Sequence, residues 1–309
     1  MKVILGALLW AFLTIGLTAG VHARNGLERF EQEIKPQFEL KKFTYGSAKP
    51  LGDTGFVLEN VEAIVPASEA TGDKESTVRI DKVIVDDLDF DRLRKDTPDN
   101  LSPRYARLRL EGISSDDELF SALEPYGVPR VPVDLALDYR IDPAAKVLTV
   151  KKLEIDLRGQ GRLELGLVMD GISDKTDLDG AKDDGRLRTA SLSIDDKGLL
   201  SKLVPAMAEE EGMKPDDMIN TALSTLAAFA AMQNGETLKA LDAISSFVAD
   251  WKAPKGPLDM GLKPAKTAGL DDLDKIMLPN ALSTLFGFTA TYSGTRPGAA
   301  LAGDKKKQR

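Results

Sequence analysis

The sequence predicts an α+β protein, in which a long, twisted antiparallel β-sheet built as a meander packs against a C-terminal helical segment. Three observations predict it. Apolar and polar residues alternate along residues 131–172, with the two-residue period of strands that keep one face in water. Apolar residues recur at helical spacing along residues 198–251. Strand patterns then return at 258–262 and 286–292, so strands distant in sequence are expected to join one sheet.

The first part of the chain is mostly strand pattern. Leu27, Phe30 and Ile34 recur at helical spacing until Pro36 ends a short helix. Residues 55–65 and 78–85 then alternate between apolar and polar side chains. Both segments are predicted to be strands with one solvated face.

The clearest strands lie between Val131 and Ile172. Residues 133–139 alternate, the turn residues 142–145 follow, and residues 147–157 and 162–169 alternate in the same way. Gly159-Gln160-Gly161 separates the last two segments and predicts a hairpin turn. A solvated loop at 170–185 leads to a further strand at 187–194.

Three helices are predicted at residues 198–211, 215–233 and 236–251. Pro215 stands at a first-turn position, and Gly235 follows a helix C-terminus. The third helix carries a single apolar stripe, which is the candidate face for an apolar ligand or the inner face of a lid. The stripe consists of Leu238, Leu241, Ile244, Phe247 and Trp251.

The N-terminus has the three parts of a secretory signal. Lys2 is followed by an apolar run, and Val21-His22-Ala23 predicts cleavage after Ala23. Export to the periplasm is therefore expected. The alternative is an uncleaved inner-membrane tether that faces the periplasm, because residues 3–21 approach the length of about 20 residues that spans a bilayer.

After cleavage the chain would contain neither histidine nor cysteine, since His22 is its single histidine and it has no cysteine. Imidazole and thiolate carry most nucleophilic, acid/base and transition-metal chemistry at neutral pH. No nucleophile elbow, P-loop or dinucleotide-binding loop is present. We therefore expect no catalytic, cofactor or metal site and no enzymatic activity. A hydrolase that uses two carboxylates stays open as an alternative.

Acidic pairs recur before Leu-rich segments, at Asp86-Asp87, Asp116-Asp117, Asp195-Asp196 and Asp271-Asp272. Their repetition favours helix N-caps over catalytic or metal-binding pairs. Asp87, Asp89 and Asp91 open like a calcium loop, but Arg92 replaces its glycine and Pro98 its bidentate glutamate. Asp177 and Asp179 also lack the spacing of such a loop.

The chain is acidic, with 41 Lys and Arg against 49 Asp and Glu and a net charge of −8. An acidic surface argues against nucleic acid as a partner. Residues 294–309 end in Lys305-Lys306-Lys307-Gln308-Arg309. We expect this segment to be a flexible basic tail, with contact to anionic lipid as the alternative.

Three segments carry a family resemblance: Leu58–Val61, Val83–Phe90 and Leu153–Leu165. Their β pattern resembles the repeated segments of proteobacterial envelope proteins of the AsmA-like or YdgA-like type. The resemblance implies a curved antiparallel sheet with helices, placed in the periplasm, and a role in envelope maintenance or lipid movement. It implies no particular binding residue.

The expected organisation is a signal peptide at 1–23, one α+β domain at 24–293 and the tail at 294–309. Within the domain, residues 24–196 are mainly β, 197–251 mainly α, and 252–293 return to the sheet. The function expected is non-enzymatic binding of an apolar or lipid ligand, or of an envelope partner. A structural or protein-interaction module of the cell envelope is the alternative.

Overall fold

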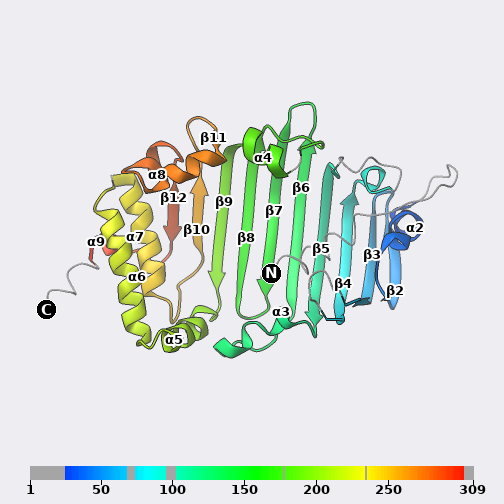
Figure 1. The fold of residues 1–309 in the computed structure, drawn as a ribbon, viewed down its shortest axis with the longest axis horizontal. Helices are drawn as coiled ribbons and strands as arrows, with labels where there is room; N and C mark the ends of the chain where they lie inside the picture. Colours follow the sequence, from blue (N-terminus) through cyan, green and yellow to red (C-terminus); the bar gives the residue numbers. More distant parts are fainter. Residues whose placement is uncertain (1–24, 68–73, 95–101, 177, 234, 303–309) are drawn as a thin grey trace. The chain divides into compact units, whose positions relative to one another are not determined.

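The computed structural model describes residues 25–67, 74–94, 102–176, 178–233 and 235–302 (Figure 1). The predicted signal segment and its cleavage site at Ala23 lie outside these residues. The chain divides into two compact units. The N-terminal unit comprises Met1–Ala122, Arg130–Ile155 and Ile172–Ala181, and the C-terminal unit comprises Leu123–Pro129, Asp156–Gly171 and Lys182–Arg309.

The strands of the N-terminal unit follow one another as a meander. They are β1 (Lys42–Thr44), β2 (Ser47–Leu51), β3 (Gly55–Val65), β4 (Ser76–Leu88), β5 (Tyr105–Ser115), β6 (Val133–Asp142) and β7 (Val147–Leu157). Their order is β1-β3-β4-β5-β6-β7, with β2 also paired to β3. The pairs from β1 to β6 are antiparallel.

The register of these strands produces the core of the unit. Leu58 lies opposite Val83, Val83 opposite Leu110, and Leu110 opposite Leu135, so one apolar row crosses four strands. Phe30 covers this face and stacks on Phe56 with ring centroids 4.5 Å apart.

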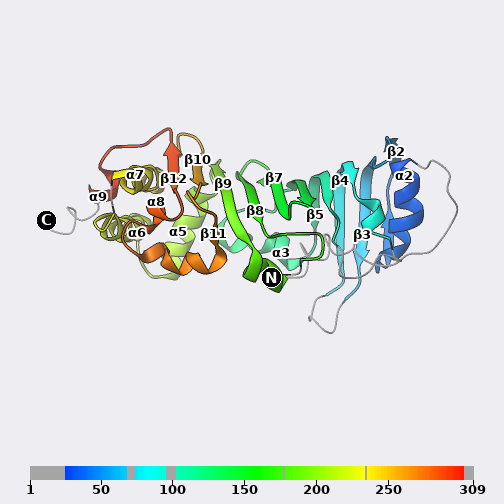
Figure 2. The ribbon, with the colours of Figure 1, turned by 90° about the horizontal axis from the view of Figure 1, so that it is seen from above.

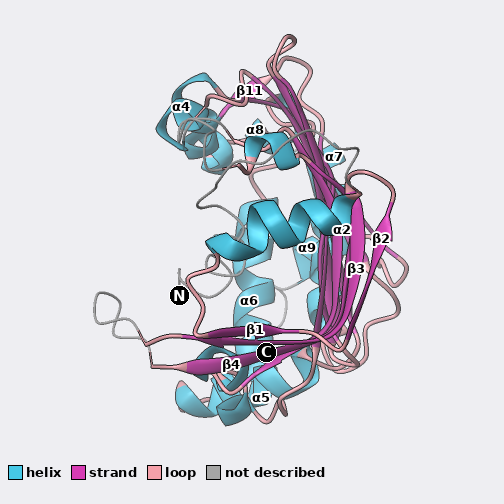
Figure 3. Ribbon diagram, turned by 90° about the vertical axis from the view of Figure 1, so that its right-hand side faces the viewer, coloured by secondary structure: helices cyan, strands magenta, loops and turns pink. Residues whose placement is uncertain are grey.

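The covering segment of the N-terminal unit is helical. It comprises α2 (Gly26–Arg29), the π-helical turn η1 (Phe30–Ile34) and the 3₁₀ turn η2 (Lys35–Gln37). Figures 2 and 3 show α2 beside β3, on one face of it. The short elements η3 (Phe90–Arg92) and α3 (Glu118–Ser121) connect strands of the same unit.

The C-terminal unit combines strands with most of the helices. Its strands are β8 (Gly161–Asp170), β9 (Arg186–Asp196), β10 (Leu258–Leu262) and β12 (Thr289–Tyr292), ordered β8-β9-β10-β12, and β11 (Ala268–Gly269) pairs with β9. These pairs are antiparallel. The helices are α5 (Leu200–Glu210), α6 (Pro215–Ala230), α7 (Gly235–Ala249), α8 (Ala281–Thr284) and α9 (Ala299–Ala302), with the 3₁₀ turns η4 (Glu124–Tyr126) and η5 (Leu270–Met277). The helix α4 (Leu178–Asp184) precedes β9.

The predicted fold class is confirmed: the structure is α+β, with a large set of antiparallel strands and helices toward the C-terminus. The three predicted helices correspond to α5, α6 and α7. The predicted strand at 286–292 is shorter, because α8 and the turn after it take residues 281–288. The single domain expected at 24–293 stays a prediction.

The start of the flexible tail is placed too early by the sequence. Residues 294–302 lie against α7, where Asp242 accepts hydrogen bonds from the backbone of Gly298 and Ala300. Glycine and alanine allow this close approach, although their composition is also typical of a linker. Among the described residues, no helix has the length and apolarity that a membrane crossing requires.

Candidate functional site

The predicted ligand face of α7 lies inside the packing of the C-terminal unit. Leu241, Phe247 and Trp251 are buried, whereas Leu238 and Ile244 are partly buried. The ring of Phe247 meets Tyr292 of β12 edge to face, with centroids 5.4 Å apart.

The chain's own residues therefore cover this stripe. Leu241 packs with Ala230 of α6 and Ala300 of α9. Phe247 packs with Leu258 of β10. The stripe contacts α6, α9 and two strands. That a ligand borders it stays a prediction.

The strands next to this core carry a second apolar face. Leu163 of β8 lies opposite Ile194 of β9, and Leu165 lies opposite Leu192. Since directly opposed residues share a face of a sheet, these side chains lie on one side. Leu167 lies opposite Ala190 and continues the pattern. We call Leu163, Leu165, Leu167 and Leu192 the leucine face.

The helices cover only one end of this face. Ile194 packs against the cluster of Ala243 and Phe247, together with Leu258 and Met260 of β10. On β8, by contrast, Leu163 is 38% exposed, and Leu165 and Leu167 are only partly buried. An apolar row that is only partly buried thus adjoins the α7 core.

The opposite face of the same strands is polar. Glu164 lies opposite Ser193, and the Ser193 hydroxyl donates to Asp259 Oδ1 of β10 at 2.6 Å. Ser191 lies opposite Gly166 and is exposed. The exposed Leu163 and the partly buried leucines therefore lie on one side of β8 and β9.

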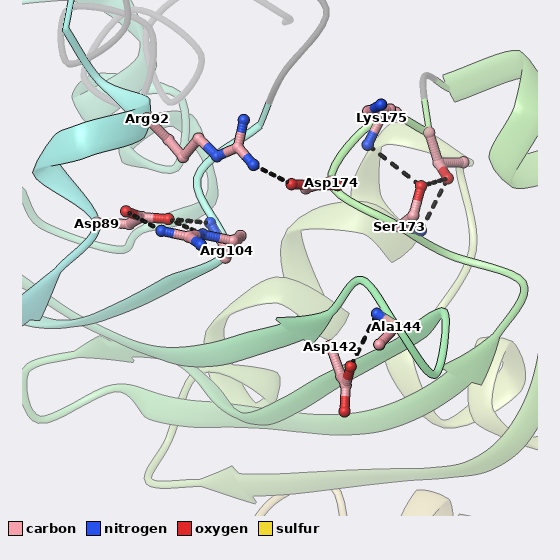
Figure 4. Close-up of polar contacts among 9 residues, drawn as sticks. Asp89, Arg92, Arg104, Asp142, Ala144, Ser173, Asp174 and Lys175 are labelled. Carbon is pink, nitrogen blue, oxygen red and sulfur yellow. Dashed lines mark hydrogen bonds and ion pairs between the residues drawn. The ribbon is translucent and has the colours of Figure 1, made fainter. Parts of the chain in front are cut away.

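The N-terminal unit contains a buried ion pair between Asp89 and Arg104 (Figure 4). Asp89 is only 1% exposed. Arg104 donates to its carboxylate from Nε at 2.7 Å, from Nη2 at 3.0 Å and from the backbone N at 3.0 Å. The hydrogen bond to Asp89 raises the pKa of the Arg104 guanidinium. Arg104 thus contacts both oxygens of the buried carboxylate.

A second pair fixes the loop that follows β8. Asp174 is buried and its Oδ2 accepts from Arg92 Nη2 at 2.6 Å, while its backbone carbonyl accepts from Ser102 N at 2.8 Å. The Ser173 hydroxyl accepts from Lys175 N at 3.2 Å (Figure 4). Asp142 similarly accepts from Ala144 N at 3.0 Å in the turn after β6 (Figure 4). These carboxylates organise loops.

Tyr139 lies close to the ion pair of Asp89 and Arg104, and its side chain is largely buried. Its hydroxyl donates to the carbonyl of Pro103 at 3.0 Å. Burial, followed by the negative charge of Asp89, raises the pKa of Tyr139 to about 12. The phenol therefore stays protonated at neutral pH and serves as a donor.

The calcium-like opening at Asp87, Asp89 and Asp91 is divided among other partners. Asp89 binds Arg104, and Asp91 binds Arg29 Nη2 at 2.7 Å. Asp177 lies outside the described residues, as does the side chain of Asp179. In the part of the chain that the structure describes, no group of three or more acidic or histidine side chains is placed to hold a metal ion.

The cap interpretation of the acidic pairs is confirmed for Asp117, which is the N-cap of α3. Asp196 and Asp272 accept backbone hydrogen bonds beside α5 and η5, but the N-cap positions there belong to Leu199 and Gly269. Asp117 accepts from Leu119 N at 2.8 Å, Asp196 from Leu200 N at 2.9 Å, and Asp272 from Gly269 N at 2.9 Å. The cap interpretation is wrong for the first pair, which lies within β4. There Asp86 faces Arg107 and Arg109 across to β5.

Sequence reasoning identified the strands of the leucine face but not the face itself. The alternation carries the signal: residues 162–169 present leucine at every second position, and residues 190–194 present Ala190, Leu192 and Ile194 at the same spacing. The register that aligns the two sets is visible only in the fold.

Part of the chain matches a known family model. Residues 154–293 match a family model described as an uncharacterized protein. This range includes β8, β9, α5, α6, α7, β10 and β12. No curated protein matches the chain.

Proposed function

We propose that this protein is a non-enzymatic binding protein of the bacterial envelope, and that it holds the acyl chain of a lipid on the leucine face. The observation that carries the proposal is the row Leu163, Leu165 and Leu167. This row adjoins the helix-covered core, but its side chains are only partly buried or exposed. Soluble surfaces seldom leave contiguous apolar patches without a binding role.

The chemistry of this face suits a chain of methylene groups. Leu165 and Leu192 oppose each other directly, and the polar residues of both strands point to the other side. Removing apolar surface from water contributes about 25 cal/mol per Å². An acyl chain laid along the row would gain from each leucine without needing a polar partner.

Two features of the sequence support the non-enzymatic and envelope parts of the proposal. Residues after His22 contain neither histidine nor cysteine. The first 23 residues have the organisation of a secretory signal, which would bring the protein to the compartment between two lipid membranes.

Extraction of bound lipid tests this function. The full chain, purified from its native envelope without detergent exchange, is extracted with organic solvent and analysed by mass spectrometry. We expect one lipid class to be enriched in the wild type and depleted by Leu163→Lys. Equal lipid content in both proteins, or none in either, would contradict the proposal.

A protein-interaction module is the second candidate, and exposed methionines favour it. Met207 of α5, Met213 after it and Met232 after α6 are all more than one-third exposed. Methionine is common at adaptable binding surfaces. Crosslinking in the envelope, followed by capture of the full chain, should then give one protein partner that Met207→Ser with Met213→Ser removes.

A further inference from the structure

The polar stripe of α7 binds a segment near the C-terminus. Asp242, Ser246 and Asp250 are spaced by four residues and therefore lie on one side of the helix and of the turn that follows it. Residues 294–302, which we call the C-terminal strap, run along this stripe.

The side chains of the stripe bind mainly the backbone of the strap. Asp242 accepts from Gly298 N and Ala300 N, both at 2.8 Å. Ser246, which is fully buried, accepts from Arg296 N at 2.9 Å through Oγ and donates from that atom to the carbonyl of Asp242 at 2.6 Å. Asp250 adds an ion pair with the Arg296 guanidinium.

The strap contributes little apolar packing of its own. Ala300 is buried against Ala230 and Leu241, whereas residues 295–298 are exposed. Larger side chains of α6 and α7 pack against the same cluster and are only partly buried. These are Leu226, Phe229, Leu238 and Ile244. Segments with few buried contacts open without global unfolding.

We propose that this side of α7, together with α6, is a peptide-binding site that the strap occupies in cis. It takes a chain segment with an arginine followed, four residues later, by a small apolar residue, as in Arg296–Ala300. A glycine or alanine between them lets the peptide backbone approach Asp242. The site is separate from the leucine face and does not depend on a lipid.

Covalent attachment keeps the site closed. A tethered segment has an effective concentration on the order of millimolar, so a free peptide of equal affinity cannot compete until the strap is weakened. Weakening the strap without altering α7 should therefore open the site to a peptide in trans.

Fluorescence anisotropy with a fluorescein-labelled peptide of residues 293–309 tests the proposal. The full chain with Arg296→Ala and Ala300→Glu should bind this peptide at least tenfold more tightly than the wild type does. Adding Asp242→Asn and Ser246→Ala should remove that gain. Asp216→Asn, which changes an exposed carboxylate of α6, is the matched control and should leave binding unchanged.

Three outcomes would overturn the proposal. One is a weakened strap variant that keeps the wild-type circular dichroism spectrum but does not bind. Another is wild-type binding as tight as that of the variant. If the variant does not fold, amide exchange of the wild type decides: Arg296, Gly298 and Ala300 should be protected yet exchange before β10. Exchange of these amides only together with β10 would exclude a releasable strap.

Discussion

Leu192 of β9 lies directly opposite Leu165 of β8, and both side chains stay partly exposed although they border the packed core of the C-terminal unit. The neighbouring pair of Ile194 with Leu258 is covered by α7. The helix α7 thus covers only part of this sheet face. The part that it leaves uncovered is the binding surface that we propose.

The buried pair of Asp89 and Arg104 should be essential for the stability of the N-terminal unit. Arg104→Ala leaves a carboxylate buried without its partner, which costs about 3 kcal/mol or more. Arg109→Ala removes a half-exposed arginine that faces Asp86 at 3.6 Å, and should cost about 1 kcal/mol or less. Urea unfolding of the two variants measures both values. Similar losses in the two would show that burial of Asp89 has no energetic role.

Tyr139 should make stability fall at alkaline pH. Its pKa is about 12 in the folded protein, against an ordinary value of about 10. Above pH 10 the unfolded chain releases this proton while the folded chain keeps it, so the free energy of unfolding falls by up to about 1.4 kcal/mol per pH unit and levels off near pH 12.

Tyr139→Phe isolates this contribution. The variant loses the hydrogen bond to Pro103 and should be about 1 kcal/mol less stable at pH 7, but its decline between pH 10 and 12 should be shallower. Tyr126→Phe is the conservative control. Urea unfolding at several pH values tests the pair, and parallel declines in wild type and Tyr139→Phe would disprove the assignment.

The start of α2 requires a glycine. A Cβ on Gly26 would lie 2.3 Å from the carbonyl oxygen of Gly55, the first residue of β3. Gly26→Ala should therefore displace the helix from the strand and cost about 1–3 kcal/mol.

Gly235 provides the comparison, because nothing lies within 4 Å of a Cβ added there. Gly235→Ala should leave stability unchanged or raise it by up to about 1 kcal/mol. Thermal unfolding followed by circular dichroism orders the two variants. Equal melting temperatures would mean that α2 tolerates the shift.

Local sequence patterns were sufficient for the elements of this fold. The alternation at 162–169 and the boundaries Pro215 and Gly235 placed strands and helices because each depends on neighbouring residues. The division into two units depends on long-range packing and has no such local signal.

The candidate sites depended more on tertiary contacts. The stripe of Leu241 and Phe247 was recognised as apolar, but only the fold shows that α6, α9 and the strands cover it. The sequence does not predict the contact of the strap with α7. Gly298 and Ala300 bind Asp242 through their backbone N–H groups, and backbone contacts produce no pattern of side chains in the sequence.

The central claim is that the leucine face binds an acyl chain. The most direct measurement is fluorescence titration of the full-length wild type, Leu192→Lys and Ser191→Lys with 11-(dansylamino)undecanoic acid. Adjacent residues of β9 then receive the same charge on opposite faces. We expect Leu192→Lys to weaken binding at least tenfold and Ser191→Lys to match the wild type. Equal affinity in all three proteins, or a loss in Ser191→Lys alone, would contradict the account.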